Sequence, residues 1–160
     1  MSAAIQILGI LLACNGAPLL LARLLGSRGA AAIDMNRVLA DGRPLFGASK
    51  TWRGFFAMPL AGALLCALLD CGWHVGLMLG FLAAVGDLFS SFVKRRLGLE
   101  AGARCNGLDQ LPESALPSLY AVSALELPWH YALLVPLAFW GAQRLLSKVL
   151  YRLHLRQRPY

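Results

Sequence analysis

An aspartate, two serines and a lysine stand at helical spacing near the end of a long apolar stretch. Asp87, Ser90, Ser91 and Lys94 stand at i, i+3, i+4 and i+7, which places them on one face of a helix. A carboxylate that faces lipid is costly, so it normally faces protein, a partner or a water-filled cavity. Two arginines follow the lysine directly. A carboxylate beside hydroxyls and clustered cations provides the groups that a metal–phosphate site needs.

A second group of polar residues lies between the first two apolar stretches. Lys50, Thr51 and Arg53 cluster where a helix is expected to begin, and free backbone N–H groups at such a point favour anions. The segment 47–51 lacks the full GxxxxGK[ST] pattern and follows no strand, so we reject a P-loop. The cations could also serve only as anchors on the inner side of a membrane, and this second interpretation stays open.

Two further polar residues accompany apolar segments. Asp109 lies in a Leu-Asp-Gln-Leu context and could cap a helix, or supply the second carboxylate of a magnesium site with Asp87. Asn15 stands midway through the first apolar stretch, together with Pro18. It could form an interhelical hydrogen bond beside a proline kink, or point into a cavity shared with Asp87.

The composition is that of an integral membrane protein. The 160 residues are 58% hydrophobic and only 14% charged, which is too apolar for an ordinary soluble domain of this size. The formal net charge is +7, but the basic residues cluster between apolar stretches and do not cover a soluble surface. This pattern favours membrane topology over nucleic-acid binding.

Five apolar segments can be drawn. We therefore predict an all-α integral membrane protein, a single domain over residues 1–160. It is a bundle of about five transmembrane helices with two basic cytoplasmic loops. The predicted segments are 3–25, 54–69, 74–93, 114–127 and 129–146.

The distribution of lysine and arginine predicts the orientation. Basic residues fill the loop 26–53, the loop 94–104 and the C-terminal tail, whereas the connections 70–74 and 126–130 contain none. By the positive-inside rule the basic segments are cytoplasmic, and five spans then place the N-terminus outside. If 114–127 were re-entrant, the tail cations would lie on the wrong side, so charge favours five spans. We expect an inner (cytoplasmic) membrane of a bacterium or archaeon, with the active site on the cytoplasmic side.

A possible lipoprotein cleavage site and the four cysteines indicate no special chemistry. The run Leu11–Cys14 resembles a lipoprotein cleavage site, but no cation precedes it and the apolar run continues to Leu25. The four cysteines show no CxxC pairing and no histidine at metal-ligand spacing, so neither disulfides nor zinc are expected. They are Cys14, Cys66, Cys71 and Cys105.

The motifs together resemble the CDP-archaeol synthase family, integral-membrane CTP:lipid-phosphate cytidylyltransferases related to CDP-diacylglycerol synthases. The resemblance implies a small five-helix fold and a magnesium-dependent transfer of CMP from CTP to a lipid phosphate. After Gln110 the chain departs from the family, because it reads Leu-Pro-Glu-Ser where many archaeal members continue with an apolar helix. The segments that carry the resemblance are Asn15 with Pro18, 41–54, 86–98 and 108–110.

The resemblance also implies roles for the polar residues. Asp87 and Asp109 hold Mg²⁺, while the cations and hydroxyls bind the phosphates of CTP and of the lipid. No protein nucleophile is needed. Lys94 is placed with the two aspartates in the catalytic set, and the substrate-binding residues are Asn15, Lys50, Thr51, Arg53, Ser91, Arg95 and Arg96.

Two other classes remain open at the level of sequence. A small transporter or channel would explain an intramembrane aspartate, but not two cation-rich loops on one side. A CDP-alcohol phosphatidyltransferase would carry several spaced aspartates, yet none follows Asp41 until Asp70. The expected partners are CTP, a lipid phosphate and the surrounding lipids. The lipid's chains and linkage leave no motif, and the sequence is compatible with a homo-oligomer without defining one.

Overall fold

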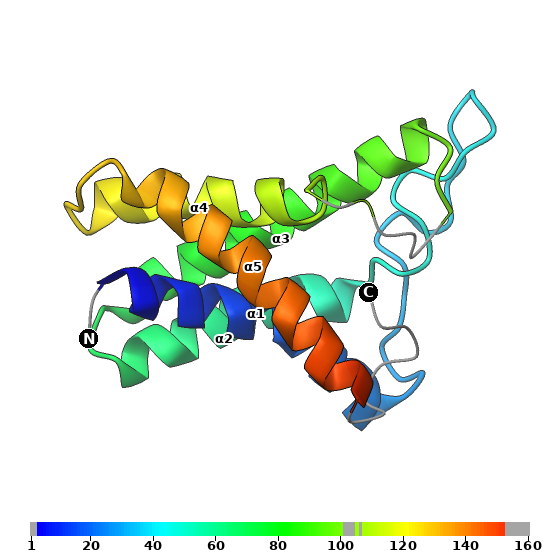
Figure 1. The fold of residues 1–160 in the computed structure, drawn as a ribbon. Coiled ribbons are helices and arrows are strands. Elements are labelled where there is room, and N and C mark those ends of the chain that lie inside the picture. Colours follow the sequence, from blue (N-terminus) through cyan, green and yellow to red (C-terminus); the bar gives the residue numbers. More distant parts are fainter. Residues whose placement is uncertain (1–2, 101–104, 106, 153–160) are drawn as a thin grey trace.

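The computed structural model describes residues 3–100, 105 and 107–152, and within them it contains five helices (Figure 1). They match the predicted all-helical bundle. The helices are α1 (Ala3–Leu25), α2 (Trp52–Leu68), α3 (Trp73–Arg96), α4 (Gln110–Ala124) and α5 (Tyr131–Arg152).

Two of the described helices, α1 and α3, are long and apolar enough to cross a bilayer. The 17-residue α2 is also apolar but shorter. The structure therefore supports a membrane protein, while the number of spans stays a prediction.

Several helix boundaries differ from the sequence prediction: α4 ends three residues earlier than predicted, α5 ends six residues later, and two further differences bear on the site. The prediction that Lys94, Arg95 and Arg96 lie in a loop was wrong, because α3 continues through them. Cations are favourable in the last turn of a helix, where the helix dipole is negative. Helix α4 begins at Gln110, four residues earlier than expected. Pro112 falls in its first turn, where a proline costs no hydrogen bond.

Glycines let the helix backbones touch. A Cβ atom on Gly62 would lie 2.2 Å from the carbonyl oxygen of Gly76, which joins α2 to α3. A Cβ atom on Gly86 would lie 2.2 Å from the carbonyl oxygen of Pro112, which joins α3 to α4. Such close contacts are typical of helices that associate in lipid. The second contact stands directly beside Asp87.

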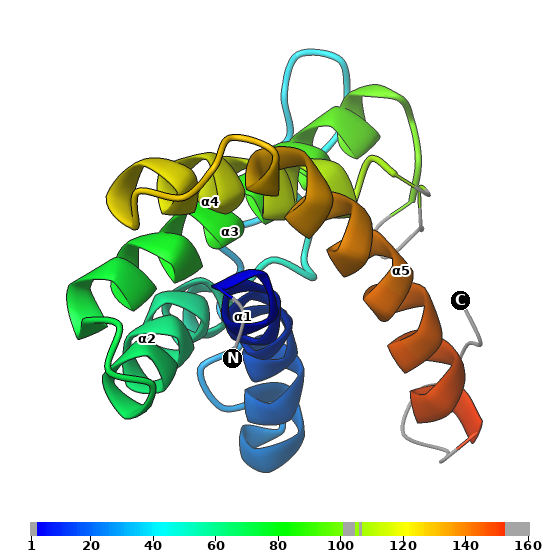
Figure 2. The same cartoon turned by 60° about the vertical axis from the view of Figure 1, so that its left-hand side comes forward.

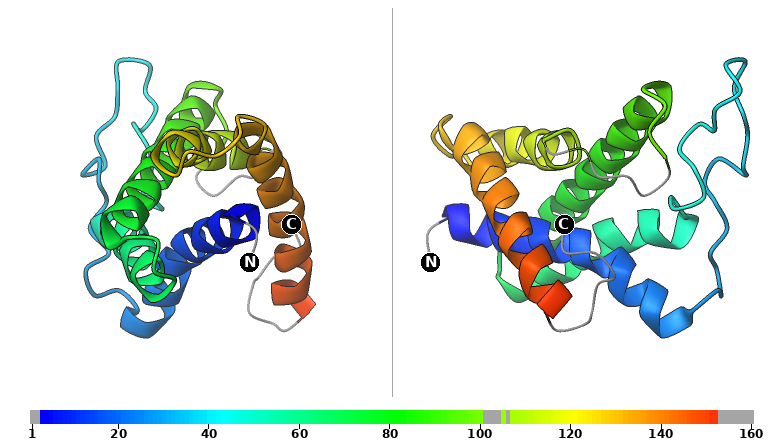
Figure 3. Two further views of the ribbon diagram at one scale, coloured as in Figure 1. Left: turned by 90° about the vertical axis from the view of Figure 1, so that its left-hand side faces the viewer. Right: turned by 45° about the vertical axis from the view of Figure 1, so that its right-hand side comes forward.

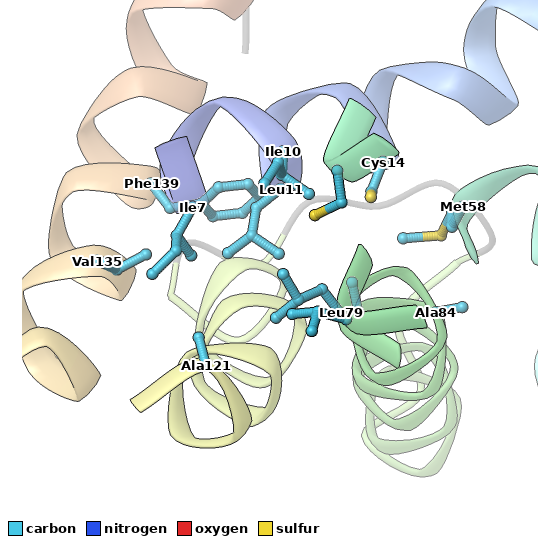
Figure 4. Packing of buried hydrophobic residues seen from close by; sticks show 13 residues of the cluster. Ile7, Ile10, Leu11, Cys14, Met58, Leu79, Ala84, Ala121, Val135 and Phe139 are labelled. Atoms are coloured by element: carbon cyan, nitrogen blue, oxygen red, sulfur yellow. The ribbon is translucent and has the colours of Figure 1, made fainter. Parts of the chain in front are cut away.

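Helix α1 lies inside the arc that the other four helices form (Figure 2; Figure 3, left). The buried side chains of α1 meet those of α3, α4 and α5 in one apolar cluster (Figure 4). Its largest members include Ile7, Leu11, Leu79 and Phe139.

The basic segments share one end of the bundle. The connection 26–51 and the C-terminal end of α3 lie together at the right of Figure 1. The turns between α2 and α3 and between α4 and α5 lie at the opposite end. The fold therefore brings the cation-rich loop to the helix end that carries Asp87 and Lys94.

The contact at Gly86 predicts a specific loss of stability. In Gly86→Ala the new methyl group meets backbone atoms that cannot rotate away, so we expect a loss of about 1–3 kcal/mol. Gly141→Ala in α5 is the control, because no atom of the described residues lies within 4 Å of its Cβ position. Alanine there should leave stability unchanged or raise it by up to about 1 kcal/mol. Thermal unfolding in detergent measures both, and equal effects would contradict the contact.

Candidate active site

Lys50 and Asp87 form an ion pair between the long connection and α3. The Nζ atom of Lys50 lies 2.6 Å from each carboxylate oxygen of Asp87, and both side chains are partly buried. Lys50 directly precedes Thr51, the N-cap residue of α2, whose hydroxyl accepts a hydrogen bond from the N–H of Gly54.

A pocket of about 270 Å³ opens beside this pair. Its walls are largely apolar and come from α1, α2 and α3, and Lys50 and Asp87 supply its charged groups. This combination suits a ligand with an anionic head and apolar chains. The lining residues include Pro18, Ile33, Thr51, Phe55, Met58 and Ala84.

Lys94 and Asp109 form a second ion pair. The Nζ atom of Lys94 lies 2.6 Å from Oδ1 of Asp109, and both side chains are largely shielded from solvent. Asp109 stands at the N-cap position of α4, but its side chain makes no capping hydrogen bond. Its Oδ2 accepts a hydrogen bond of 3.1 Å from the N–H of Cys105. The geometry therefore does not support a capping role.

Glu113 in the first turn of α4 is a functional candidate that the sequence analysis missed. The residue is 6% exposed. The charges that act on it are those of Asp87, Lys50, Asp109 and Lys94. The predicted helix began at Ser114. The sequence analysis therefore missed that Glu113 follows Asp109 by four residues, a spacing that places both on one helix face.

Asp34 fixes the conformation of the connection that carries Lys50. Its carboxylate accepts hydrogen bonds of 3.0, 2.9 and 2.8 Å from the N–H groups of Asn36, Phe46 and Gly47. Burial acts to raise the pKa of Asp34, but these backbone donors outweigh it and lower the pKa below its usual value. The hydrogen bond to Asn36 forms the local Asx turn that an Asp-x-Asn sequence favours. This short motif was the only sequence signal for the role of Asp34.

Arg96 ties the connection to the end of α3. Its guanidinium pairs with Asp41 and donates to the carbonyl oxygens of Arg43 and Pro44. Arg43 in return donates to the carbonyl oxygen of Arg96. Desolvation raises the pKa of Asp41, but the Arg43 N–H and the Arg96 guanidinium hold it below its usual range.

The two remaining predicted arginines, Arg53 and Arg95, have different surroundings. Arg53 donates hydrogen bonds of 2.7 and 2.6 Å to the carbonyl oxygens of Gly26 and Arg28, so it braces the connection. Arg95 is buried and donates to the carbonyl oxygen of Glu100 at 2.6 Å, while its Nε has no hydrogen-bond partner among the residues that the structure describes. It lines a pocket of about 640 Å³ with Arg43.

Asn15 does not share the pocket of Asp87. It lines a separate pocket of about 510 Å³ between α1 and α5, opposite Gln143. Ser91 is buried on α3, as its spacing from Asp87 and Lys94 predicts. The structure thus brings Lys50, Thr51 and Asp87 together, but not Asn15.

The donor set is compatible with magnesium held jointly by protein and substrate. Mg²⁺ prefers oxygen ligands and is usually bound by one or two carboxylates, with waters and substrate phosphates completing its shell. Within the described part of the chain, no three histidine, cysteine, aspartate or glutamate side chains group closely enough to hold a metal. Asp87 and Asp109 are oxygen donors of the kind that Mg²⁺ prefers, and in the structure each of them is paired with a lysine.

Comparison with known proteins agrees with the fold. The sequence model of a family described as CarS-like: CDP-archaeol synthase matches residues 5–160. A CDP-archaeol synthase of Hyperthermus butylicus is 37% identical over 93% of this chain and 90% of its own. That of Pyrococcus furiosus is 38% identical over 76% and 81%.

A solved structure has the same fold. It is described as an intramembrane enzyme for archaeal membrane lipids biosynthesis. It aligns with a TM-score of 0.70 and 30% identity over 91% of this chain and 92% of its own. The resemblance inferred from the motifs is confirmed, and the chain belongs to the CDP-archaeol synthase family.

Proposed function

We propose that this chain is a membrane enzyme that transfers CMP from CTP to a lipid phosphate, giving a CDP-lipid and pyrophosphate. The observation that carries the proposal is the Lys50–Asp87 pair at the mouth of an apolar pocket between helices. The relatives are named for CDP-archaeol, so the product proposed here is a CDP-archaeol-type lipid.

The reaction needs positioning and charge neutralisation. An oxygen of the lipid phosphate attacks the α-phosphorus of CTP, and the bond from that phosphorus to the pyrophosphate oxygen breaks. No protein nucleophile takes part, since the lipid phosphate supplies the attacking atom. The apolar pocket would place the lipid phosphate beside Lys50. Lys94, which pairs with Asp109, lies on the same face of α3 as Asp87.

Asp87 and Asp109 are the residues that would hold magnesium. The bound ion would neutralise phosphate charge and polarise the reacting phosphoryl group. Lys50 and Lys94 neutralise the two carboxylates in the structure. We propose that the flexible lysine side chains turn to the substrate phosphates when the nucleotide binds.

The three arginines of the predicted site divide between binding and support. Arg95 lines a pocket with Arg43, and its Nε finds no partner within the described part of the chain, so it is suited to bind a phosphate. Arg96 and Arg53 brace the connection 26–51 through its backbone carbonyls. Their loss should therefore act by displacing Lys50.

A transporter or a phosphatidyltransferase is not favoured. The chain matches CDP-archaeol synthases over nearly its whole length. That relationship accounts for both the intramembrane aspartate and the cation-rich loops.

The proposed setting is a cytoplasmic membrane, with five spans, the N-terminus outside and the basic end of the bundle in the cytoplasm. The positions of lysine and arginine support it. A reporter fused after Tyr160 should be accessible from the cytoplasm, and one inserted near Cys71 from outside. An externally accessible C-terminal fusion would contradict five spans.

The reaction is tested with purified protein, radiolabelled CTP, magnesium and a lipid phosphate. We expect a CDP-lipid and one pyrophosphate per turnover, with no product after chelation of divalent cations. Ether-linked isoprenoid and ester-linked acyl phosphates are compared side by side. Release of inorganic phosphate in place of pyrophosphate, or turnover in the presence of chelator, would refute the proposal.

Isosteric amides test the two carboxylates. Asp87→Asn and Asp109→Asn keep the side-chain shape but lose the charge, so each should reduce kcat by at least about a hundredfold. The double variant should be little worse than either single variant, because the two residues act as one unit. Asparagine caps helices as well as aspartate does, so a fully active Asp109→Asn enzyme would leave the residue a merely structural role.

A further inference from the structure

The turn that ends α2 brings two cysteines together. Cys66 lies in the last turn of α2 and is buried, whereas Cys71 follows the helix and is half-buried. Both are free thiols in the structure. The turn between α2 and α3 lies at the opposite end of the bundle from the basic connection 26–51, so neither thiol takes part in the proposed reaction (Figure 1). The sequence analysis expected no disulfide because it found no CxxC motif, but here the contact arises from the way a helix ends.

The backbone of this turn places the two side chains against each other. Asp70 has a φ of 55°, the left-handed conformation in which many helices end, and aspartate tolerates it better than most residues. The N–H of Cys71 then donates a hydrogen bond of 3.0 Å to the carbonyl oxygen of Cys66. This closure is the Schellman motif, in which the side chains of the first and last residues frequently make contact. Cysteine occupies both of those positions.

The side-chain contacts agree with this placement. The Sγ atom of Cys71 lies 3.6 Å from the carbonyl oxygen of Cys66. Cys66 belongs to the buried apolar cluster, and Cys71 packs against the same cluster from the turn. A disulfide needs its two Cβ atoms roughly 3.5–4.5 Å apart. Residues that touch across a Schellman turn can meet this requirement by rotation of their side chains, with the backbone kept as it is.

We propose that Cys66 and Cys71 form a disulfide that closes the turn between α2 and α3. The oxidant is another disulfide, either a small molecule or a carrier protein, and the step is thiol–disulfide exchange. In the orientation proposed above, this turn faces away from the cytoplasm, where disulfides form and persist. The inference rests on that orientation for its setting and on the turn geometry for its chemistry.

The exchange proceeds in two steps that balance. The thiolate of Cys71, the more accessible of the two, attacks one sulfur of the oxidant, and the other sulfur leaves as a thiolate. The thiolate of Cys66 then attacks Sγ of Cys71 in the mixed disulfide and expels the second thiolate of the oxidant. The two cysteines lose two electrons and two protons in total. These reduce the disulfide of the oxidant to two thiols.

The test uses the purified full-length protein in a non-ionic detergent, with glutathione disulfide as the oxidant. The remaining thiols are then alkylated, and the protein is cut with trypsin. No lysine or arginine lies between Arg53 and Lys94, so a single peptide carries Cys66 and Cys71 and no other cysteine. We expect this peptide to lose two hydrogen atoms and to take up no alkylating agent. Cys105, which is also half-buried, is the internal control and should carry glutathione or the alkylating agent.

Serine variants separate the two steps. Cys66→Ser should stop at a stable mixed disulfide between Cys71 and glutathione, because no second thiol resolves it. Cys71→Ser should leave Cys66 unmodified by the oxidant, since that thiol is buried. Wild-type protein that accumulates glutathione on Cys71 without forming the cross-link would overturn the inference.

Thiol trapping in cells tests the setting. Membranes are isolated after an acid quench and alkylated without reductant, and we expect the cross-linked peptide. Free thiols at both positions, together with an external reporter near Cys71, would overturn the inference and leave the orientation standing. Free thiols together with a cytoplasmic reporter would refute the orientation, and the inference with it.

Thermal unfolding shows whether the bond fits the native turn. The oxidised wild type should have a Tm a few degrees above that of the protein reduced with dithiothreitol, because the cross-link restricts the unfolded chain. Cys71→Ser is the matched control and should have the same Tm under both conditions. An equal or lower Tm of the oxidised wild type would mean that the bond distorts the turn, and would overturn the inference.

Discussion

The ion pair between Lys50 and Asp87 is the interaction on which the site depends. It joins a residue of the long connection to a helix that begins more than twenty residues later in the chain. Without a partner, the carboxylate of Asp87 would be an isolated charge among apolar helices, which is unfavourable in a membrane protein. The pair therefore defines where the connection must end and where the charged ligand groups meet the apolar pocket.

The connection 26–51 is built to hold that lysine in place. Asp34 gathers three backbone N–H groups within it, and Arg96 fastens it to the end of α3. Backbone bridges pair Ala32 with Thr51 and Val38 with Pro44. A segment without regular secondary structure thus becomes a defined wall of the site, which fits the general rule that binding residues often lie on loops held by a rigid scaffold.

Sequence patterns predicted the parts of this protein that depend on local periodicity. Helix α1 has the predicted bounds, and the face of α3 that carries Asp87 and Lys94 follows from helical spacing alone. The partners of those residues could not be predicted in the same way. The contact of Lys50 with Asp87 spans 37 positions, and only the packing of α2 on α3 brings them together. Glu113 was missed because a polar, proline-containing first turn hid the start of α4 from an analysis of apolar runs.

We propose that the two aspartates, which lysines neutralise in the structure, form the site where cation and nucleotide meet. A structure of the chain with Mg²⁺ and a non-hydrolysable CTP analogue tests it most directly. We expect an ion bound by Asp87 and Asp109, with Nζ of Lys50 moved to within about 3 Å of a phosphate oxygen. Finding the nucleotide elsewhere, with both lysines still paired with their aspartates, would contradict it.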